Sequence, residues 1–297
     1  MLAELDRLGT VAAVSRALHL TAPAISMQLA ALEREVGLNL TEKNGRGIAL
    51  TPAGKLLAQH GHDIVDQLKL AEMEVSALRD GTVGTYRVAA FPSIARTIVA
   101  AAWAELAQTG DSGLRLELLE LEPHESLPAL AAGEVDLALA HSYSNMSGAL
   151  PKGLESALLL TEPVWLAVPK SSTNEQSADL VQFASHNWIV PHRGLSCYEM
   201  VQRACGLAGF TPHVIAETSD FAVQLALVGA GAGVALIPQL TINVLPDTVQ
   251  LLTLAAPVVR HDFVVARHTS AADAGYRTLR ELFTKTAQQF SAVYRPL

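Results

Sequence analysis

The chain has 297 residues, of which 50% are hydrophobic and 17% are charged, and its formal net charge is −8. This length suits two or three compact units, and the two cysteines are too few for a disulfide framework. With no basic leader, no uncharged run of about 18 apolar residues and no Cys/His cluster at metal-ligand spacing, we expect a soluble cytoplasmic protein with no membrane partner, metal or cofactor.

Residues 9–36 predict two short amphipathic helices joined by a sharp turn. Apolar residues recur at helical spacing in both segments: Val11, Val14 and Leu18 in the first, and Ile25, Leu29 and Leu32 in the second. Between them, Thr21 can cap the second helix and Pro23 suits its first turn. The pattern predicts a helix-turn-helix whose second helix reads DNA.

The segment after Gly37 predicts a β-wing. Gly37 is a typical helix stop, and the turn dipeptide Asn44-Gly45 separates two short strands, Leu40-Thr41 and Ile48 to Leu50. Lys43 and Arg46 fall at the tip of this hairpin, where they could reach phosphates or the minor groove. The alternative is a small helical subdomain whose apolar stripes form only a core.

A long helix is predicted from Pro52 to about Arg79. Its apolar or small positions follow a heptad pattern: Leu57, Gly61, Ile64, Leu68, Ala71, Val75 and Leu78. Residues 1–55 carry six Lys or Arg and five Asp or Glu, a net charge of +1, so a monomer should bind DNA weakly. We therefore expect the heptad positions other than Gly61 to pair two subunits: Leu57, Ile64, Leu68, Ala71, Val75 and Leu78. The alternative is that the helix packs on its own domain.

From residue 84 the sequence alternates strands and helices and predicts two βαβ units. The first comprises a strand at 86–90, a helix at 94–107, a strand at 114–121, a helix at 124–132 and a strand at 135–140. The second comprises a strand at 187–190, a helix at 196–208, a strand at 214–217, a helix at 220–229 and a strand at 233–237. Strands at 164–168 and 263–266 would cross between two lobes, which implies a cleft, and a helix at 271–290 would return to the first lobe.

The predicted domains follow from these elements. Residues 1–54 form the winged helix-turn-helix, residues 55–83 the linker and dimerisation helix with a hinge, and residues 84–297 an α/β domain. Within that domain we expect lobe I at 84–163 and 267–297 and lobe II at 164–266.

The chain resembles the LysR-type transcriptional regulators along nearly its whole length. The specific matches are GTVAAVSRALHLTAPAIS, LEREVG and RGIALTPAG within residues 9–54; GTYRVAAFPSIA, AAGEVDLALA and GAGAGVALIP are weaker. The resemblance implies an effector domain with the two-lobed periplasmic-binding-protein fold, a homodimer or homotetramer, operator DNA, a small-molecule effector and contact with RNA polymerase. Family members usually have several more residues before Leu2, so we expect an incomplete first helix.

The expected DNA contacts combine the local pattern with this resemblance: Thr21, Ala22, Pro23, Ser26, Met27, Gln28, Lys43 and Arg46. Ala22 stands where many members have Gln, and Met27 where many have Arg, so an operator sequence cannot be transferred from a relative. Met27 could touch a thymine methyl, although a core-facing or solvent-facing role is the more frequent one. Thr41 replaces the usual aromatic residue.

The expected effector site lies between the lobes and comprises Ser93, His141, Arg193, Ser196, Thr218 and Ser219. Ser93 opens a helix after a strand, which suits an anion, and Arg193 follows a strand end, where it could pair with a carboxylate or phosphate. We therefore predict a small anionic or polar effector. The alternatives are that Ser93 is only a helix cap, Arg193 a surface arginine and His141 a satisfied loop histidine.

A redox sensor and an enzyme are the two alternative classes of function. Peroxide-sensing members of the family carry two cysteines in this region, but Cys197 and Cys205 would lie about 12 Å apart on one helix, too far for a disulfide without refolding. An enzyme is not predicted, because the glycine-rich run at 229–233 precedes a strand and no catalytic set stands out. Glu120 and Glu122, on one strand face, fit a solvated surface.

Overall fold

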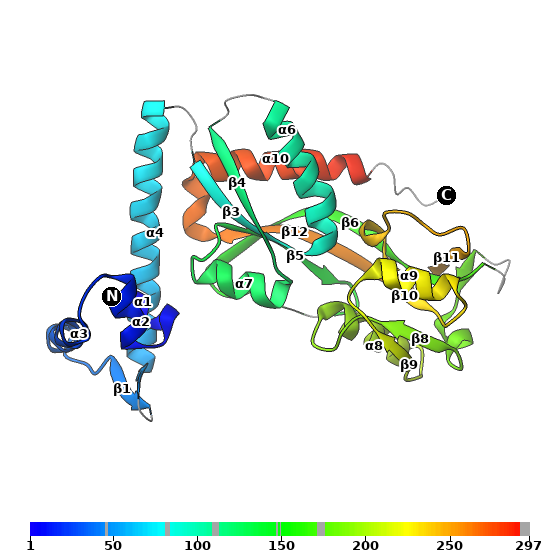
Figure 1. Cartoon of the computed structure of the whole chain (residues 1–297), viewed down its shortest axis with the longest axis horizontal. Coiled ribbons are helices and arrows are strands. Elements are labelled where there is room, and N and C mark those ends of the chain that lie inside the picture. Colours follow the sequence, from blue (N-terminus) through cyan, green and yellow to red (C-terminus); the bar gives the residue numbers. More distant parts are fainter. Residues whose placement is uncertain are drawn as a thin grey trace. The chain divides into compact units, whose positions relative to one another are not determined.

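The computed structural model describes residues 1–44, 47–80, 84–108, 113–146, 148, 150–170 and 176–291. The chain divides into two compact units, residues 1–80 and residues 81–297. Figure 1 labels their helices and strands. None of the helices in the described residues combines the length and hydropathy needed to cross a membrane.

The first unit is a helical bundle with a two-stranded wing. Its elements are α1 (Leu2–Leu8), α2 (Val11–Ala17), α3 (Ala22–Val36), β1 (Thr41–Asn44), β2 (Gly47–Leu50) and α4 (Pro52–Asp80). The Thr10 and Thr21 side chains cap α2 and α3, and Gly37 ends α3 with a φ of 75°. The predicted helix-turn-helix, wing and long helix are therefore confirmed, and α1 is present with seven residues.

A small apolar core holds this unit together. The predicted stripes meet in it, with Val14 and Ile25 fully buried. The Glu33 carboxylate ties α3 to the wing by accepting bonds from the amides of Leu40 and Thr41 at 2.9 and 2.8 Å, and these bonds lower its pKa. At Gly54, a Cβ would lie only 2.0 Å from the Leu40 carbonyl oxygen, so the start of α4 packs on the wing only with glycine.

The second unit consists of a long mixed sheet with helices on its faces. Its strands are β3 (Gly84–Ala90), β4 (Leu114–Glu120), β5 (Leu137–Tyr143), β6 (Leu154–Pro169), β7 (Ser177–Ala178), β8 (Asn187–Val190), β9 (His213–Glu217), β10 (Ala235–Pro238), β11 (Val249–Leu254) and β12 (Val259–Arg267). Its helices are α5 (Pro92–Ile94), the π-helical turn Ala95–Val99, α6 (Ala100–Gln108), α7 (Pro123–Ala131), α8 (Ser196–Leu207), α9 (Phe221–Gly229) and α10 (Ala274–Ser291), with short 3₁₀ turns that include Gln239–Thr241. All ten predicted elements of the two βαβ units are recovered, with small shifts in their bounds.

Two long strands connect the lobes. The described strands run in the order β4-β3-β5-β12-β6-β11-β7, with β10 also on β6, while β8 and β9 pair separately in parallel. The sequence placed the first crossing strand at 164–168, but β6 starts ten residues earlier and continues through Pro163. β12 pairs with β5 from Arg260 to Val265, so it belongs to the sheet of lobe I, whereas the sequence division assigned residues up to 266 to lobe II. Strand β11 was not predicted.

Helices cover both lobes. In lobe I, α7 packs on β5 and α10 packs on β6 and α6 (Figure 1). In lobe II, α9 packs on β6 and β10, and the apolar core extends under α8 around Trp188, Met200 and Leu236. Because the helices begin where the parallel strands end, the strand ends and helix N-termini of both lobes gather around a shared pocket.

Candidate functional site

The first candidate surface is the exposed face of α3. All six predicted contacts at its start are exposed, and Met27 is 72% exposed: Thr21, Ala22, Pro23, Ser26, Met27 and Gln28. The Ser26 hydroxyl donates to the Ala22 carbonyl at 3.1 Å and Thr21 caps the helix, whereas Gln28 makes no hydrogen bond with a described residue. Met27 faces solvent rather than the core, and the amide of Gln28 is free to reach a base.

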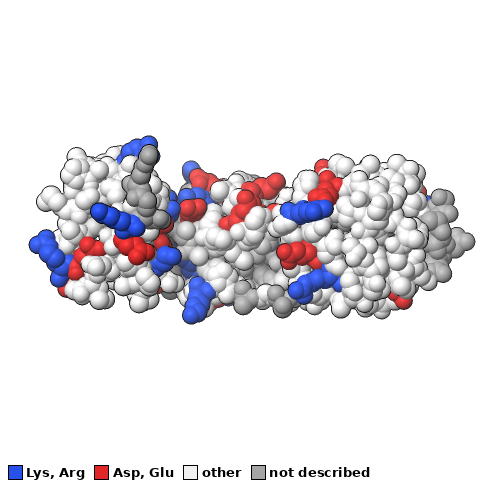
Figure 2. Space-filling model, turned by 90° about the horizontal axis from the view of Figure 1, so that it is seen from below, with Lys and Arg blue, Asp and Glu red and all other residues white. Residues whose placement is uncertain are grey.

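The charge around this surface is mixed. Lys43 lies exposed on β1, and Arg46 lies outside the described residues. On the face shown in Figure 2, acidic and basic side chains are interspersed over the first unit. The mixture agrees with the net charge of +1 counted over residues 1–55.

Apolar side chains on α4 form the second candidate surface. Ile64 and Leu68, two of the predicted dimer contacts, are exposed, as are Leu56 and Val65. Leu57, a third predicted contact, instead packs against the core of its own unit, because the first turns of α4 lie against α1. Beyond these turns, at Ile64 and Leu68, the apolar stripe of α4 no longer packs on the first unit and is exposed. The remaining predicted contacts, Ala71, Val75 and Leu78, have side chains outside the described residues.

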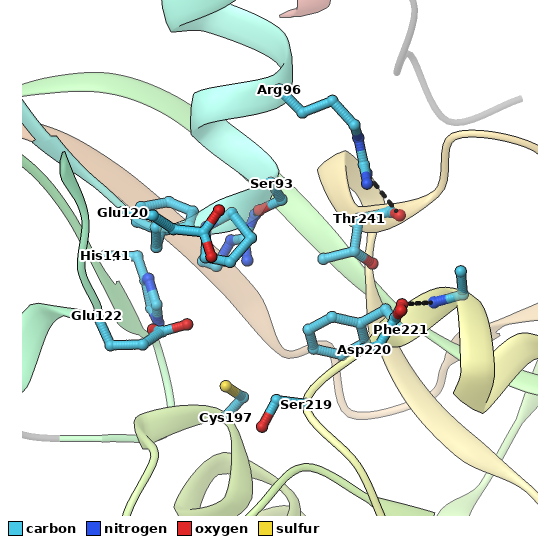
Figure 3. A pocket seen from close by; sticks show the side chains of 14 residues that line it. Ser93, Arg96, Glu120, Glu122, His141, Cys197, Ser219, Asp220, Phe221 and Thr241 are labelled. Atoms are coloured by element: carbon cyan, nitrogen blue, oxygen red, sulfur yellow. Dashed lines mark hydrogen bonds between the residues drawn. The ribbon is translucent and has the colours of Figure 1, made fainter. Parts of the chain in front are cut away.

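The third candidate site is a pocket of about 370 Å³ in the second unit. Both lobes contribute to its wall (Figure 3): Phe91, Pro92, Ser93, Arg96, Glu120, Glu122, His141, Cys197, Ser219, Asp220, Phe221, Ala222, Thr241 and Arg260. A volume in this range suits a small molecule. Aromatic rings, hydroxyls and charges of both signs are available to it.

A buried group of charges lies behind the pocket wall. The guanidinium of Arg260, on β12, is only 2% exposed and forms an ion pair with Glu162 on β6. It also contacts Asp262 at 3.3 Å and donates to the Ser93 hydroxyl at 3.0 Å. Burial raises the pKa of the Asp262 carboxyl well above its ordinary value.

Two connections to the 3₁₀ turn 239–241 join the lobes at this point. The amide of Leu240 donates to the Glu162 carboxylate. The guanidinium of Arg96, on the π-helical turn, donates to the carbonyl oxygens of Leu240 and Thr241 at 3.2 and 2.9 Å (Figure 3). Because Arg96 and Thr241 also line the pocket, a bound molecule would touch residues that connect the lobes.

His141 is a buried imidazole in the pocket wall. It lies on β5, is 8% exposed, and its Nε2 is 2.8 Å from the Ser196 hydroxyl at the start of α8. Burial lowers its pKa well below the ordinary value, and the nearby charge of Arg260 lowers it further. Its Nδ1 has no hydrogen-bond partner among the described residues. The structure therefore brings together two of the predicted site residues, across the two lobes.

The remaining predicted effector residues divide into two groups. Ser93 and Ser219 line the pocket, although Phe91, not Ser93, holds the cap position of α5. Arg193 lies outside the described pocket lining: its side chain is 72% exposed and pairs with Glu217 at 3.0 Å. Thr218 is also outside the lining and instead bonds to the backbone amide of Asp220.

Sequence reasoning missed the most deeply buried functional candidates. Arg260, Glu162 and Asp262 are charged residues in strands of otherwise apolar character, and Arg260 and Asp262 are separated by a single residue. Charged residues are almost never fully buried unless paired, and these three fall outside the predicted strands 164–168 and 263–266, so the sequence did not mark them as buried. Their partners could not be identified, because Arg260 bonds to residues 98 and 167 positions away.

Both cysteines are free, buried and on α8. Cys197 lines the pocket and Cys205 lies in the core of lobe II. Burial raises the pKa of the Cys197 thiol to about 11 and that of the Cys205 thiol to about 12. Since the thiolate is the reactive form, neither site favours oxidation at neutral pH.

Two family models match the chain: the LysR substrate binding domain over residues 79–288, and the bacterial regulatory helix-turn-helix protein of the lysR family over residues 1–55. The uncharacterized HTH-type transcriptional regulator YnfL of Escherichia coli K12 is 27% identical over 226 residues, covering 74% of each chain. Full-length OxyR from Pseudomonas aeruginosa superposes with a TM-score of 0.67 at 18% identity, covering 97% of this chain and 94% of that one. An H2O2-bound OxyR mutant of Corynebacterium glutamicum gives a TM-score of 0.62 at 17% identity, covering 98% and 92%. The two structural similarities concern the fold alone.

Proposed function

The chain belongs to the LysR family of transcriptional regulators, and from that premise we propose that it binds double-stranded operator DNA as a homodimer or homotetramer and responds to a small polar effector. Residues 1–54 would bind DNA, residues 55–83 would pair subunits and residues 84–297 would bind the effector. No chemical step is needed, so the proposed role is regulatory and not enzymatic. Operator binding would take place in the cytoplasm, where the bacterial chromosome lies.

The exposed start of α3 supports operator reading. Met27 and Gln28 project from a helix whose opposite face is fixed by Ile25 and Leu29 in the core. A glutamine amide can make a bidentate contact with adenine, and a methionine can pack against a thymine methyl. Ala22 cannot make a polar side-chain contact, so base recognition would depend on the other residues of this face and on the wing.

Exposed apolar side chains on α4 support subunit pairing. Leaving Ile64, Val65 and Leu68 in water is unfavourable, and a second copy of α4 would remove them from it. Two reading helices on one dimer would also double the few phosphate contacts that each weakly charged unit offers. Affinity for DNA would therefore depend on dimerisation and fall steeply with salt.

The pocket carries the proposal for effector response. A ligand between the lobes would touch Arg96 and Thr241, which share a hydrogen bond that connects the lobes. Ligand binding can only shift an equilibrium between arrangements that it binds differently, and a pocket with walls on two lobes meets that condition. The resulting change in lobe angle would alter DNA bending or contact with RNA polymerase.

Genome-wide footprinting with the purified full-length protein tests this function. We expect discrete protected sites with dyad symmetry, and we expect Gln28→Ala to weaken specific binding by about 1–3 kcal/mol while leaving non-specific binding unchanged. Gln59→Ala, the same chemical change at an exposed position of α4, is the control. Salt-labile binding without a dyad motif would overturn the regulatory role.

Redox sensing through Cys197 and Cys205 is the second candidate, and the site does not favour it. The two thiols lie on the same rigid helix, and burial raises the pKa of each. Operator binding by a Cys197→Ser variant, measured with and without peroxide, separates the alternatives. We expect peroxide to leave the binding of both the variant and the parent protein unchanged.

A further inference from the structure

We propose that the pocket selects a small ligand carrying a protonated amino group, in preference to an anion. This inference rests on the proposed function, because it takes the pocket to be the effector site. It concerns the chemical class of the effector, and it follows from which charges of the pocket wall are already balanced within the protein and which remain available to a ligand.

Three carboxylates line the pocket. Glu120 and Glu122 come from the end of β4 and the start of α7 on lobe I, and Asp220 comes from the loop before α9 on lobe II (Figure 3). The Glu120 side chain makes no hydrogen bond or ion pair with any described residue. Burial raises the pKa of Glu122, and the nearby charges of Arg260 and His124 only partly offset this effect. A ligand cation would supply the missing countercharge from between the lobes.

The two arginines that line the pocket have few free donors and little uncompensated charge for an anionic ligand. Arg260 is balanced by Glu162, contacts Asp262 and donates to Ser93, so its guanidinium has little left to offer a ligand. Arg96 bonds only to carbonyl oxygens of the described residues, so its charge is not cancelled, but two of its donor contacts are occupied. Three carboxylates therefore face one available cation.

The protein also fills positions where this kind of fold would hold an anion. Helix N-termini present free amides that favour negative charge. At α9 the cap residue is Asp220, whose carboxylate accepts from the amide of Ala222 at 2.8 Å, and at α7 the cap residue is Glu122. Both carboxylates lie in the pocket wall, so an anionic ligand approaching either helix would meet a negative charge of the protein.

The buried face of His141 supplies an independent sign of a ligand. The imidazole is more than nine-tenths buried, lines the pocket and has an Nδ1 without a hydrogen-bond partner among the described residues. Buried polar groups are nearly always satisfied. In the tautomer whose Nε2–H donates to the Ser196 hydroxyl, Nδ1 is an acceptor and suits an ammonium donor, whereas in the other tautomer Nδ1 carries the proton.

The sign of the pocket's potential can be measured with charged thiol reagents. In the full-length Cys197→Ser protein, Ala222→Cys places a thiol in the lining, and Ala226→Cys places one a helical turn further along α9, outside it. We expect the ratio of reaction rates with cationic and anionic methanethiosulfonates to be on the order of tenfold higher at the first site. Adding Glu120→Gln should lower that ratio. An equal or lower ratio at Ala222→Cys overturns the proposal.

A four-carbon series then tests binding directly: butane-1,4-diamine, 4-aminobutanoate, butane-1,4-diol and butanedioate. We expect an amine to raise the thermal midpoint of the second unit most, and Glu120→Gln to reduce that rise. Butanedioate stabilising most overturns the proposal, and if none of the four shifts the midpoint, the thiol ratio decides. Neither measurement uses DNA. A footprinting result that overturns the regulatory role would therefore not affect the interpretation of the thiol and thermal measurements.

Discussion

The candidate residues of the first unit lie on an exposed helix face above a wholly apolar core, whereas those of the second unit line a pocket backed by buried charges. Every buried polar or charged residue that the structure describes belongs to the second unit: Ser93, Ser126, His141, Glu162, Gln224, Thr241, Arg260, Asp262, Asp273 and Thr286. Contacts on an exposed face can change without cost to folding. In the pocket, the groups that would meet a ligand also hold the lobes together, so function and stability should change together there.

The largest effect should follow from breaking the buried ion pair. Glu162→Gln removes the carboxylate paired with the buried Arg260 guanidinium and leaves Asp262, at 3.3 Å, as its acidic neighbour, so we expect the second unit to lose up to about 3–5 kcal/mol of unfolding free energy. All three tryptophans lie in this unit, at 103, 165 and 188, so their fluorescence during urea unfolding reports on it selectively.

Asp262→Asn is the matched control, because it replaces a carboxyl whose pKa burial raises with a neutral group of the same shape. Its cost should stay below about 1.5 kcal/mol, the size of one ordinary hydrogen bond. Equal losses for the two variants would show that the charge of Arg260 is shared between both carboxyls.

The corresponding change in the first unit is Ile25→Ala. It removes a fully buried side chain from a core with few members, so we expect a loss of about 2–5 kcal/mol and with it the loss of operator binding. The tryptophan transition should keep its midpoint. Met27→Ala, on the exposed face of the same helix, should change affinity without changing stability. A shift of the tryptophan transition in Ile25→Ala would mean that the units unfold together, which would weaken the comparison.

A smaller, pH-dependent effect should come from His141. Its pKa is lowered in the folded state, so below about pH 6.5 the unfolded chain binds a proton that the folded chain does not. The second unit should therefore lose stability as the pH falls through this range, by up to about 1.4 kcal/mol per pH unit. Unfolding measured from pH 5 to 7 should show a shallower slope for His141→Gln, and parallel curves would contradict a neutral buried imidazole.

The smallest effect is expected at Arg193. Its ion pair with Glu217 is exposed, so Arg193→Ala should leave both the unfolding midpoint and the binding of any pocket ligand unchanged. Arg96→Ala is the contrasting variant, because it removes two hydrogen bonds between the lobes. Weaker ligand binding in the Arg193 variant alone would return this residue to the effector site.

The sequence indicated the first unit almost completely, because its signals are local. Thr21 and Gly37 mark the ends of α3, and Ile25 and Leu29 mark its buried face, all within one helix length. In the second unit the prediction of strand β6 was too short. Only the apolar run at 164–168 was predicted, whereas β6 begins at Leu154 and continues through Pro163, which lies opposite Val259 in the pairing of β6 and β12.

The sequence by itself therefore determined the family, the elements of the first unit and the ten elements of the two βαβ units, since these depend on spacing along the chain and on caps at helix ends. Only the tertiary structure decided the pocket. It turned Arg193 outward, brought His141 to Ser196 and joined Ser93 on lobe I to Arg260 and Glu162 on the two crossing strands. The pairing of such distant residues depends on how the two lobes pack around the long strands. The periodicity of the sequence carries no information about that packing.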